Sequence, residues 1–424
     1  MKKLPADLIY YIRTAVWEFN SGLIFTSIWV LLYTVMGLSL VEVSILYIVI
    51  TISNFVLEIP TGVLADVYSR RLSVIVGGVF IGLTYVLMGT FPLFAVALLG
   101  GFIEAIGDTC VSGALQAWIT DEVGEAAVGK VFLRGRQVAT PAHWAGVLLS
   151  IAMAALLNYQ APIILGGALW FVLTIFLVLF MPETNFQRTV TIKPGGKVFL
   201  DPLKASFAIF ADGMQLVRGS RILQALFIAQ LLSAAFFDGF YKFSRAHVLQ
   251  SFALPTLTLP LLGALKDNVW FGILEMLQGL FCLLGAEVIR RRVQLDKSGA
   301  PAGALLVIHS VMLVALCIFA FTGHFGLTLV LWVLVSGLQE LGQPITEAWL
   351  NLNIPSKVRA TVISMSSQTG MVGTLGSSTG LGAFGDRFGV RSALGLLNLL
   401  LLPLVWIYGR NARGLMKLEQ VAEG

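Results

Sequence analysis

Residues 161–181 read APIILGGALWFVLTIFLVLFM, a run without a charged side chain. About 20 apolar residues in a helix are enough to cross the ~30 Å hydrocarbon core of a bilayer. A long polar stretch follows, from Pro182 to about Ser220. Together the two stretches predict a membrane span followed by a linker.

The composition of the 424-residue chain agrees with a membrane protein, because 57% of its residues are hydrophobic and 12% are charged. Its mean hydropathy is +0.87. Soluble domains carry about 25% charged and ~45–50% apolar residues. The chain therefore has too little polar surface to be a cytosolic enzyme, a secreted domain or a disordered chain. The net charge of +5 is better explained by loop topology than by nucleic-acid binding.

Similar apolar runs recur on both sides of the linker. They predict an all-α membrane protein with twelve transmembrane helices in two pseudo-symmetric six-helix bundles. The predicted domains are an N-terminal bundle at 1–182, a cytoplasmic linker at 183–220 and a C-terminal bundle with a short tail at 221–424. The runs lie near 13–37, 41–65, 72–90, 93–119, 131–157, 161–181, 221–250, 266–289, 300–322, 325–350, 358–384 and 389–409.

Most Lys and Arg side chains fall in alternate loops, such as Arg70–Arg71 and Arg290–Arg292. The positive-inside rule then predicts a multi-pass protein of the plasma (inner) membrane with both termini in the cytoplasm. Lys266, Arg387 and Arg391 are the basic loop residues that this topology leaves outside.

Two further segments bear on the topology. The start, MKKLPADLIYYIR, lacks the short apolar region and cleavage site of a signal peptide, so we expect it to be retained. Residues 197–220 are basic and amphipathic, which fits either a helix on the inner membrane surface or a solvated tether.

Corresponding places in the two halves carry the same residues. Ala117-Trp118 matches Ala348-Trp349, and Gln137 follows the first pair at the same spacing as Gln368 follows the second. Repeated halves are typical of secondary transporters, whose substrate site lies near the bilayer midplane between the repeats. The repeat therefore indicates a transport function.

Charged side chains within the runs concentrate on the first, fourth, seventh and tenth. A charge at mid-bilayer costs ~2.5–3.5 kcal/mol on insertion scales, so each one needs a partner, a water-filled cavity or a function. We therefore expect these four helices to line one aqueous cavity. The predicted substrate-cavity residues are Asp238, Lys242, Arg245, Glu340, Phe237, Tyr241 and Trp17.

Glu104 and Asp108 are four residues apart and share one face of the fourth helix. Two carboxylates this close cannot both ionise at low cost, so one of them holds a proton near neutral pH. A proton-coupled carrier needs this property. The predicted proton-coupling residues are Glu104, Asp108, Glu18 and His143.

Simple charge neutralisation is the alternative for the second half. Asp238 with Lys242, or Glu340 with Arg245, would form an ion pair inside the bundle and take no part in transport. His143 would equally serve as a packed core histidine.

The segment Gly62-Val-Leu-Ala-Asp66-Val-Tyr-Ser-Arg70-Arg71 joins the second and third runs. Gly62 would allow close helix approach, Asp66 would cap a helix start, and the arginines would pair with a carboxylate such as Asp121. We expect these residues to latch the two halves on the cytoplasmic side and to stabilise an outward-open state. The predicted latch consists of Gly62, Asp66, Arg70, Arg71 and Asp121.

The G-x-x-x-D-x-x-x-R-R pattern in this loop resembles the signature motif of the major facilitator superfamily. Ser112–Glu125, the MPET of residues 181–184 and Ala348–Gln368 look most like its tetracycline- or macrolide-type drug-efflux branch. The resemblance implies drug:proton antiport by rocking of two bundles. Pro141–Gly146 keeps part of the antiporter motif of the fifth span, and Gly285–Arg292 is a copy of the loop motif without its Asp spacing.

These features favour a proton-coupled exporter of amphipathic, drug-like compounds that works by alternating access. The alternative is an importer, or a carrier of lipid-like or nutrient solutes, with the same fold. The four histidines form no catalytic pair and the sequence contains no phosphate-binding loop, so we expect neither an enzyme nor an ATPase.

The expected partners are a small-molecule substrate, protons and the lipid bilayer, and we expect a monomer that binds no nucleic acid, no cofactor and no metal. Cys110, Cys282 and Cys317 lie in apolar runs without metal-ligand spacing. We expect them to be small buried hydrophobic residues.

Overall fold

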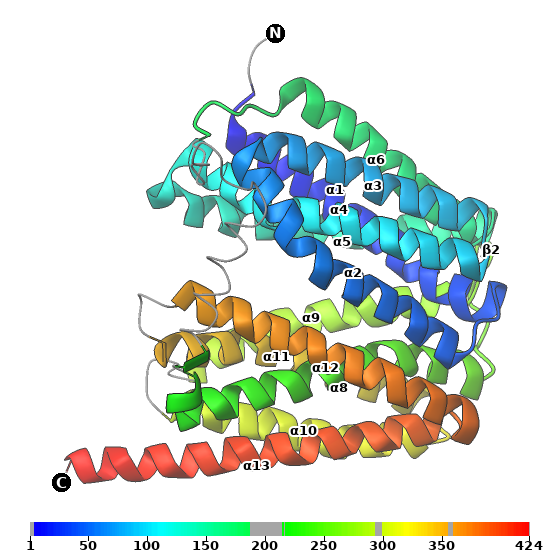
Figure 1. The fold of residues 1–424 in the computed structure, drawn as a ribbon. Coiled ribbons are helices and arrows are strands. Elements are labelled where there is room, and N and C mark those ends of the chain that lie inside the picture. The colour runs from blue at the N-terminus through cyan, green and yellow to red at the C-terminus, as the bar shows by residue number, and fades with distance from the viewer. Residues whose placement is uncertain (1–3, 187–213, 216, 293–298, 355–358, 424) are drawn as a thin grey trace. The chain divides into compact units, whose positions relative to one another are not determined.

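The computed structural model describes residues 4–186, 214–215, 217–292, 299–354 and 359–423, which are mostly α-helical (Figure 1). Inside a bilayer the backbone N–H and C=O groups find no water, so an apolar chain satisfies them within its own helices. The predicted all-α class is confirmed.

Each predicted apolar run coincides with a helix of the described chain. A short antiparallel hairpin, β1 (Thr258–Leu259) and β2 (Gly263–Ala264), interrupts the loop after α8. The helices are α1 (Ala6–Val30) with a π-helical extension η1 (Leu31–Val35), α2 (Leu40–Val67), α3 (Arg70–Thr90), α4 (Phe94–Val123), α5 (Glu125–Leu156), α6 (Gln160–Phe180), α8 (Arg221–Ser251), α9 (Asn268–Arg292), α10 (Ala300–Phe321), α11 (Phe325–Leu352), α12 (Arg359–Phe388) and α13 (Val390–Glu423).

Among the described residues, 11 helices are long and apolar enough to cross a membrane. Helix α12 falls short of this standard although it has 30 residues, because glycine, serine and threonine dilute its apolar side chains. Its Gly373 needs to be small, since a Cβ there would lie 2.1 Å from the carbonyl oxygen of Leu231 on α8.

Three sequence expectations need correction or lie outside the description. Helix α1 begins at Ala6, earlier than the expected 13–37, so Arg13 is buried inside the helix instead of lying in a cytoplasmic segment. Cys317 is exposed on α10, whereas Cys110 is buried as expected; a side chain that faces lipid needs no protein cover. Most of the amphipathic linker, 187–213 and 216, lies outside the described residues.

The chain divides into two compact units. Short segments of each half group with the other: unit 1 comprises Met1–Leu38, Val49–Lys204 and Leu254–Gly272, and unit 2 comprises Ser39–Ile48, Ala205–Ala253 and Ile273–Gly424. The domain limits expected from the sequence, with a linker at 183–220, stay a prediction.

Hydrogen bonds within each unit explain this grouping. In unit 1, the Asn268 side-chain amide at the start of α9 donates to Ser27 Oγ at 3.2 Å and to the Ser150 carbonyl at 3.4 Å. In unit 2, the Asp386 carboxylate accepts the backbone N–H of Leu40 and of Val41, at 2.9 and 3.1 Å. These bonds satisfy the first N–H groups of α2, which no turn of its own helix can reach.

Equivalent pairs of helices pack together in the two units. In unit 1, α1 packs on α5, and α3 packs on α4 and α6. In unit 2, α8 packs on α12, and α10 packs on α11 and α13. The corresponding helices are those that the internal repeat in the sequence would match.

The crossing of α1 and α5 brings two backbones into direct contact. A Cβ on Gly22 would lie 2.2 Å from the carbonyl oxygen of His143, and one on Gly146 would lie 2.0 Å from that of Phe19. Only glycine fits at either point. This contact sets the distance between the side chains of Glu18 on α1 and His143 on α5.

Candidate functional site

Four helices of unit 1 line a partly open cavity of about 100 Å³, and two acidic side chains of α4, Glu104 and Asp108, lie on its wall. A water molecule occupies about 30 Å³ of liquid, so the cavity has room for about three waters. The other lining residues are Trp17, Asn20, Ser21, Ile24 and Phe25 on α1, Ile81 and Tyr85 on α3, and Trp170 on α6.

Polar side chains from two neighbouring helices, α1 and α3, line this cavity beside the acids. The Tyr85 hydroxyl donates to Glu104 Oε1 at 2.5 Å. Asn20 is only 1% exposed, and neither its amide nitrogen nor its amide oxygen has a hydrogen-bond partner among the described residues. Because a buried amide without a partner is costly, ordered water is the natural partner for Asn20 in this cavity.

A buried cation lies beside the two acids. The Arg13 guanidinium is 4.5 Å from the centroid of the Trp17 ring, and its charge attracts both Glu18 and Asp108. The Trp17 ring packs edge-on against Trp170 with centroids 5.2 Å apart. Arg13 therefore offsets part of the negative charge that the acids bring into the unit.

The other predicted proton-coupling residues form a second pair. Glu18 Oε2 lies 3.9 Å from His143 Nδ1, and the two side chains are 29% and 25% exposed. At this distance the histidine is attracted to the carboxylate when protonated. All four predicted residues thus lie in unit 1, as two separate close pairs.

In unit 2 Asp238 and Lys242 belong to a buried cluster. Lys242 Nζ donates to Asp238 Oδ2 and to Ser378 Oγ, each at 2.5 Å. The hydroxyls of Ser377 and Ser378 donate to the same carboxylate oxygen at 2.7 and 2.8 Å. Lys242 is fully buried and lies 5.0 Å from the centroid of the Tyr47 ring. This geometry favours the ion-pair alternative over a cavity wall.

Arg245 takes a different partner from the one considered in the sequence. Its Nη2 lies 3.9 Å from Glu275 Oε1, whereas Glu340 is exposed and accepts a hydrogen bond from Gln278 Nε2 at 3.2 Å. The guanidinium also lies 3.9 Å from the centroid of the Tyr241 ring. The reason is the rotation of α9, which turns Glu275 inward within unit 2.

The aromatic residues predicted to line one substrate cavity lie in two different units. Phe237 is 40% exposed and stacks on Tyr241 with ring centroids 5.7 Å apart. Trp17 belongs to the acid cavity of unit 1. The structure therefore places Trp17 with the proton-coupling residues and Phe237 with Tyr241.

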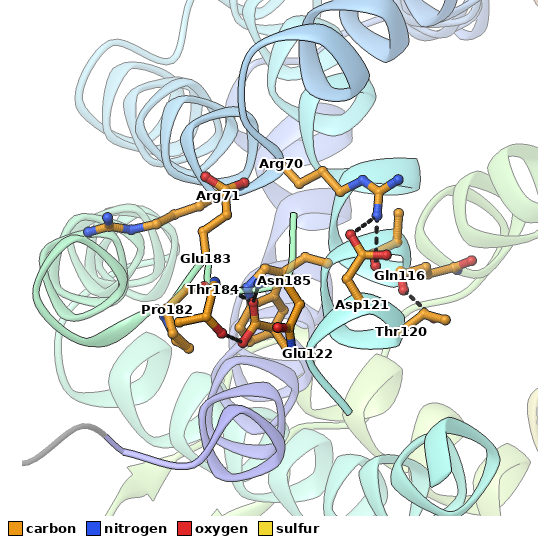
Figure 2. A network of polar contacts seen from close by, with 12 residues as sticks. Arg70, Arg71, Gln116, Thr120, Asp121, Glu122, Pro182, Glu183, Thr184 and Asn185 are labelled. Carbon is orange, nitrogen blue, oxygen red and sulfur yellow. Dashed lines mark hydrogen bonds and ion pairs between the residues drawn. The ribbon is translucent and has the colours of Figure 1, made fainter. Parts of the chain in front are cut away.

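The predicted pairing of Arg70 with Asp121 is present (Figure 2). Arg70 Nη1 also donates to the Ala117 carbonyl at 3.1 Å, so one guanidinium joins the start of α3 to the end of α4. Arg71 does not share this acid. Its Nη2 donates to the Val178 carbonyl at the end of α6, at 2.6 Å.

Two glutamates that the site prediction omitted complete this network (Figure 2). Glu183 accepts the Ser69 hydroxyl at 2.6 Å and the Arg71 backbone N–H at 3.0 Å, both at the start of α3. Glu122 accepts the backbone N–H and the hydroxyl of Thr184 at 2.7 and 2.6 Å. The chain after α6 is thereby tied to α3 and α4.

The remaining latch residues contribute less. A Cβ on Gly62 would meet no heavy atom within 4 Å, so the expected close helix approach is not made at this glycine among the described residues. Asp66 lies within α2, but its side chain is outside the description. The described network lies wholly in unit 1.

The sequence points to only some of the site residues that the prediction omitted. Glu122 and Glu183 stand in two segments already singled out, Ser112–Glu125 and the MPET of 181–184. Tyr85 and Trp170 lie on helices without central charges and carry no such signal, since their place in the cavity depends on how α3 and α6 pack.

Comparison with known sequences extends over nearly the whole chain. The model of the Major Facilitator Superfamily matches residues 14–381. An uncharacterized MFS-type transporter of Bacillus subtilis, YxaM, is 22% identical over 402 residues, which cover 94% of each chain.

Solved transporter structures share the fold at low sequence identity. A nucleoside transporter, NupG, matches with a TM-score of 0.74 at 11% identity, covering 96% of this chain and 99% of its own. A bacterial homolog of the human lysosomal transporter Spinster matches with a TM-score of 0.74 at 13% identity, covering 97% of each chain. A peptide transporter, POT, matches with a TM-score of 0.71 at 14% identity, covering 96% and 95%.

At such identities these structures bear on the fold alone. The family model covers far more than half of the sequence. This chain therefore belongs to the Major Facilitator Superfamily and is a multi-pass membrane transporter of small molecules, not an enzyme.

Proposed function

We propose that this transporter exports amphipathic, drug-like compounds in exchange for protons, by alternating access. The observation that carries the proposal is the pair Glu104 and Asp108, one helical turn apart on the wall of a small, mostly apolar cavity. Tyr85 and Arg13 supply a hydrogen-bond donor and a positive charge beside the pair.

Repulsion between the two acids supports proton binding at this pair. Side chains at i and i+4 are about 6 Å apart, and two negative charges at that distance repel by about 3 kcal/mol at an effective dielectric constant of ~20. Holding one proton between them removes most of that energy. A second negative charge becomes tolerable only when the environment changes, as it does in an alternating-access cycle.

The cavity is large enough for proton binding but too small to be the binding site of a drug-sized substrate. Pockets for drug-sized molecules measure about 300–1,000 Å³, and this cavity measures about 100 Å³. It suits a few waters and a proton far better than a drug. The pair Glu18 and His143 offers a second proton-binding position in the same unit.

Substrate contacts are proposed for the aromatic and acidic side chains of unit 2 that stay accessible. The stacked pair Phe237 and Tyr241 presents an aromatic surface, and the exposed Glu340 presents a carboxylate. Aromatic faces and carboxylates together favour amphipathic cations. Asp238 and Lys242 are less suited to this role, because their charges are already paired.

The network around Arg70 and Asp121 supports a latch at one end of unit 1. It joins α3, α4 and the segment after α6 through charge-assisted hydrogen bonds, which are about twice as strong as neutral ones. Stabilisation of an outward-open state by this network is part of the proposal.

Proteoliposomes that contain the purified protein in an inside-out orientation would test the coupling between ethidium transport and proton transport. Ethidium, a cationic amphipathic dye, serves as the probe, and an imposed pH gradient is the driving force. We expect Glu104→Gln and Asp108→Asn to lower gradient-driven ethidium accumulation at least about tenfold, since a single lost proton site uncouples transport. Exchange of ethidium without a gradient should persist in both variants. Glu125→Gln, at an exposed acid at the start of α5, is the matched control.

Full uphill accumulation in both single variants would contradict proton coupling at this pair. Accumulation only with the opposite gradient would instead favour the importer alternative.

A further inference from the structure

Unit 2 has a groove of its own. It is a groove of about 750 Å³ between α10, α12 and α13, and its walls are almost entirely apolar. Its lining includes Val314 and Cys317 on α10, Phe384 on α12, and Ser392, Gly395 and Leu399 on α13.

Small side chains open this groove. Gly395 lies under the ring of Phe321, where a Cβ would be 3.1 Å from the ring tip, and Ser392 and Cys317 are short. Val314 and Leu399 on facing helices are 60% and 56% exposed. Within a membrane-spanning unit, exposed apolar walls of this kind face acyl chains.

Two arginines are close in sequence to residues that line one end of the groove. Arg391 directly precedes the lining residue Ser392, and Arg387 lies one turn after the lining residue Phe384. The Arg387 guanidinium is 5.4 Å from the centroid of the Phe388 ring. That ring packs on Phe384 with centroids 4.7 Å apart. A chain of contacts therefore leads from the guanidinium to the wall of the groove.

The turn between α12 and α13 holds both arginines at the membrane boundary. Gly389 makes this turn with φ +87°, a conformation that other residues rarely adopt. The stretch of α13 that is long and apolar enough to cross a membrane begins at Val390, so we expect both guanidinium groups at headgroup depth. The groove then runs inward for about 10 Å along α13, from Ser392 to Leu399, at 1.5 Å per residue.

Loop topology does not account for these charges. Arg387 and Arg391 are among the few basic residues that the positive-inside rule leaves on the outer side. Both are exposed, so they are not held as buried counter-ions.

We propose that this groove binds an anionic phospholipid. Its acyl chain lies along the apolar walls of α10, α12 and α13, and its phosphate lies between Arg387 and Arg391. Arginine suits this role because its planar fork of donors matches phosphate oxygens. A zwitterionic lipid would fill the same walls, but it would gain less from two positive charges.

Native mass spectrometry of the detergent-purified protein would test this site with chain-matched phosphatidylglycerol and phosphatidylcholine. We expect phosphatidylglycerol to be retained in preference to phosphatidylcholine. The double variant Arg387→Gln/Arg391→Gln should weaken phosphatidylglycerol binding about 25-fold, roughly fivefold for each arginine, and weaken phosphatidylcholine binding much less, so that the preference between the two lipids is lost. Arg410→Gln is the matched control, because Arg410 is an exposed arginine near the other end of the apolar stretch Val390–Ala412, 5.6 Å from the Trp406 ring centroid.

Variants that fill the groove give a second, independent test of the proposal. Val314→Trp and Leu399→Trp place large side chains in the groove from exposed positions, so folding should be preserved and the bound lipid lost. Val172→Trp, at a position 61% exposed on α6, should retain it. Equal retention of the two lipids by the wild-type protein, or a preference that survives both kinds of variant, would overturn the proposal.

Discussion

Lys242 is fully buried, and its ammonium group donates to Asp238 and Ser378. Removing one partner of a buried ion pair leaves the other charge without compensation, whereas replacing both by apolar residues of similar size is often neutral. The role of this pair can therefore be separated by single and double variants.

We expect Asp238→Asn to lower the free energy of unfolding by about 3–5 kcal/mol, because Lys242 then loses its counter-charge. The double variant Asp238→Leu/Lys242→Met should regain stability and transport ethidium. Thermal unfolding of the purified protein measures the first effect. Glu287→Gln, at the exposed pairs with Arg290 and Arg291, should leave the unfolding temperature unchanged. A double variant that is stable but inactive would assign the pair to the substrate cavity instead.

At the scale of elements, the α1–α5 crossing controls the geometry of the site. The glycine contacts at Gly22 and Gly146 leave no space for a side-chain atom between the two backbones. Because Glu18 lies one turn from Gly22, and His143 lies one turn from Gly146, a change in the crossing alters the pair directly.

We expect Gly146→Ala to cost about 1–3 kcal/mol of stability, since its Cβ would force the two helices apart. Gradient-driven ethidium transport should fall along with it, because the Glu18–His143 distance grows. Gly113→Ala on α4 is the control: a Cβ there meets nothing within 4 Å, so the better helix propensity of alanine should leave stability equal or slightly higher. Equal unfolding temperatures for Gly146→Ala and wild type would contradict the close backbone contact.

At the scale of the whole molecule, the number of spans sets the side of each terminus. Helix α12 decides this number, because the other described long helices meet the apolar standard and α12 does not. Its serines bind Asp238 and its glycines pack on α8, so its polarity is used inside unit 2 and does not prevent it from crossing the bilayer.

We expect twelve crossings and two cytoplasmic termini. Fusions of green fluorescent protein to either end should fluoresce, and fusions of alkaline phosphatase to either end should be inactive. Leu261→Cys, in the exposed hairpin after α8, should react from outside the cell with a membrane-impermeant maleimide. An active phosphatase at the C-terminus alone would indicate eleven crossings.

Local patterns in the chain account for the helices and for part of the site. An apolar run such as 161–181 becomes α6 because a backbone in hydrocarbon can bond only to itself. The shared face of Glu104 and Asp108 follows from helical period, and the pairing of Arg70 with Asp121 follows from charges at neighbouring helix ends. All of these depend on residues close in sequence or at the ends of adjacent spans.

Packing between distant helices accounts for the rest. Tyr85 and Trp170 join the acid cavity, and Arg245 meets Glu275 instead of Glu340, because each helix is rotated about its axis by its neighbours. Hydropathy is nearly uniform around a membrane helix and gives no sign of that rotation. It is set by steric contacts such as Gly146 against Phe19, which exist only once the helices have packed.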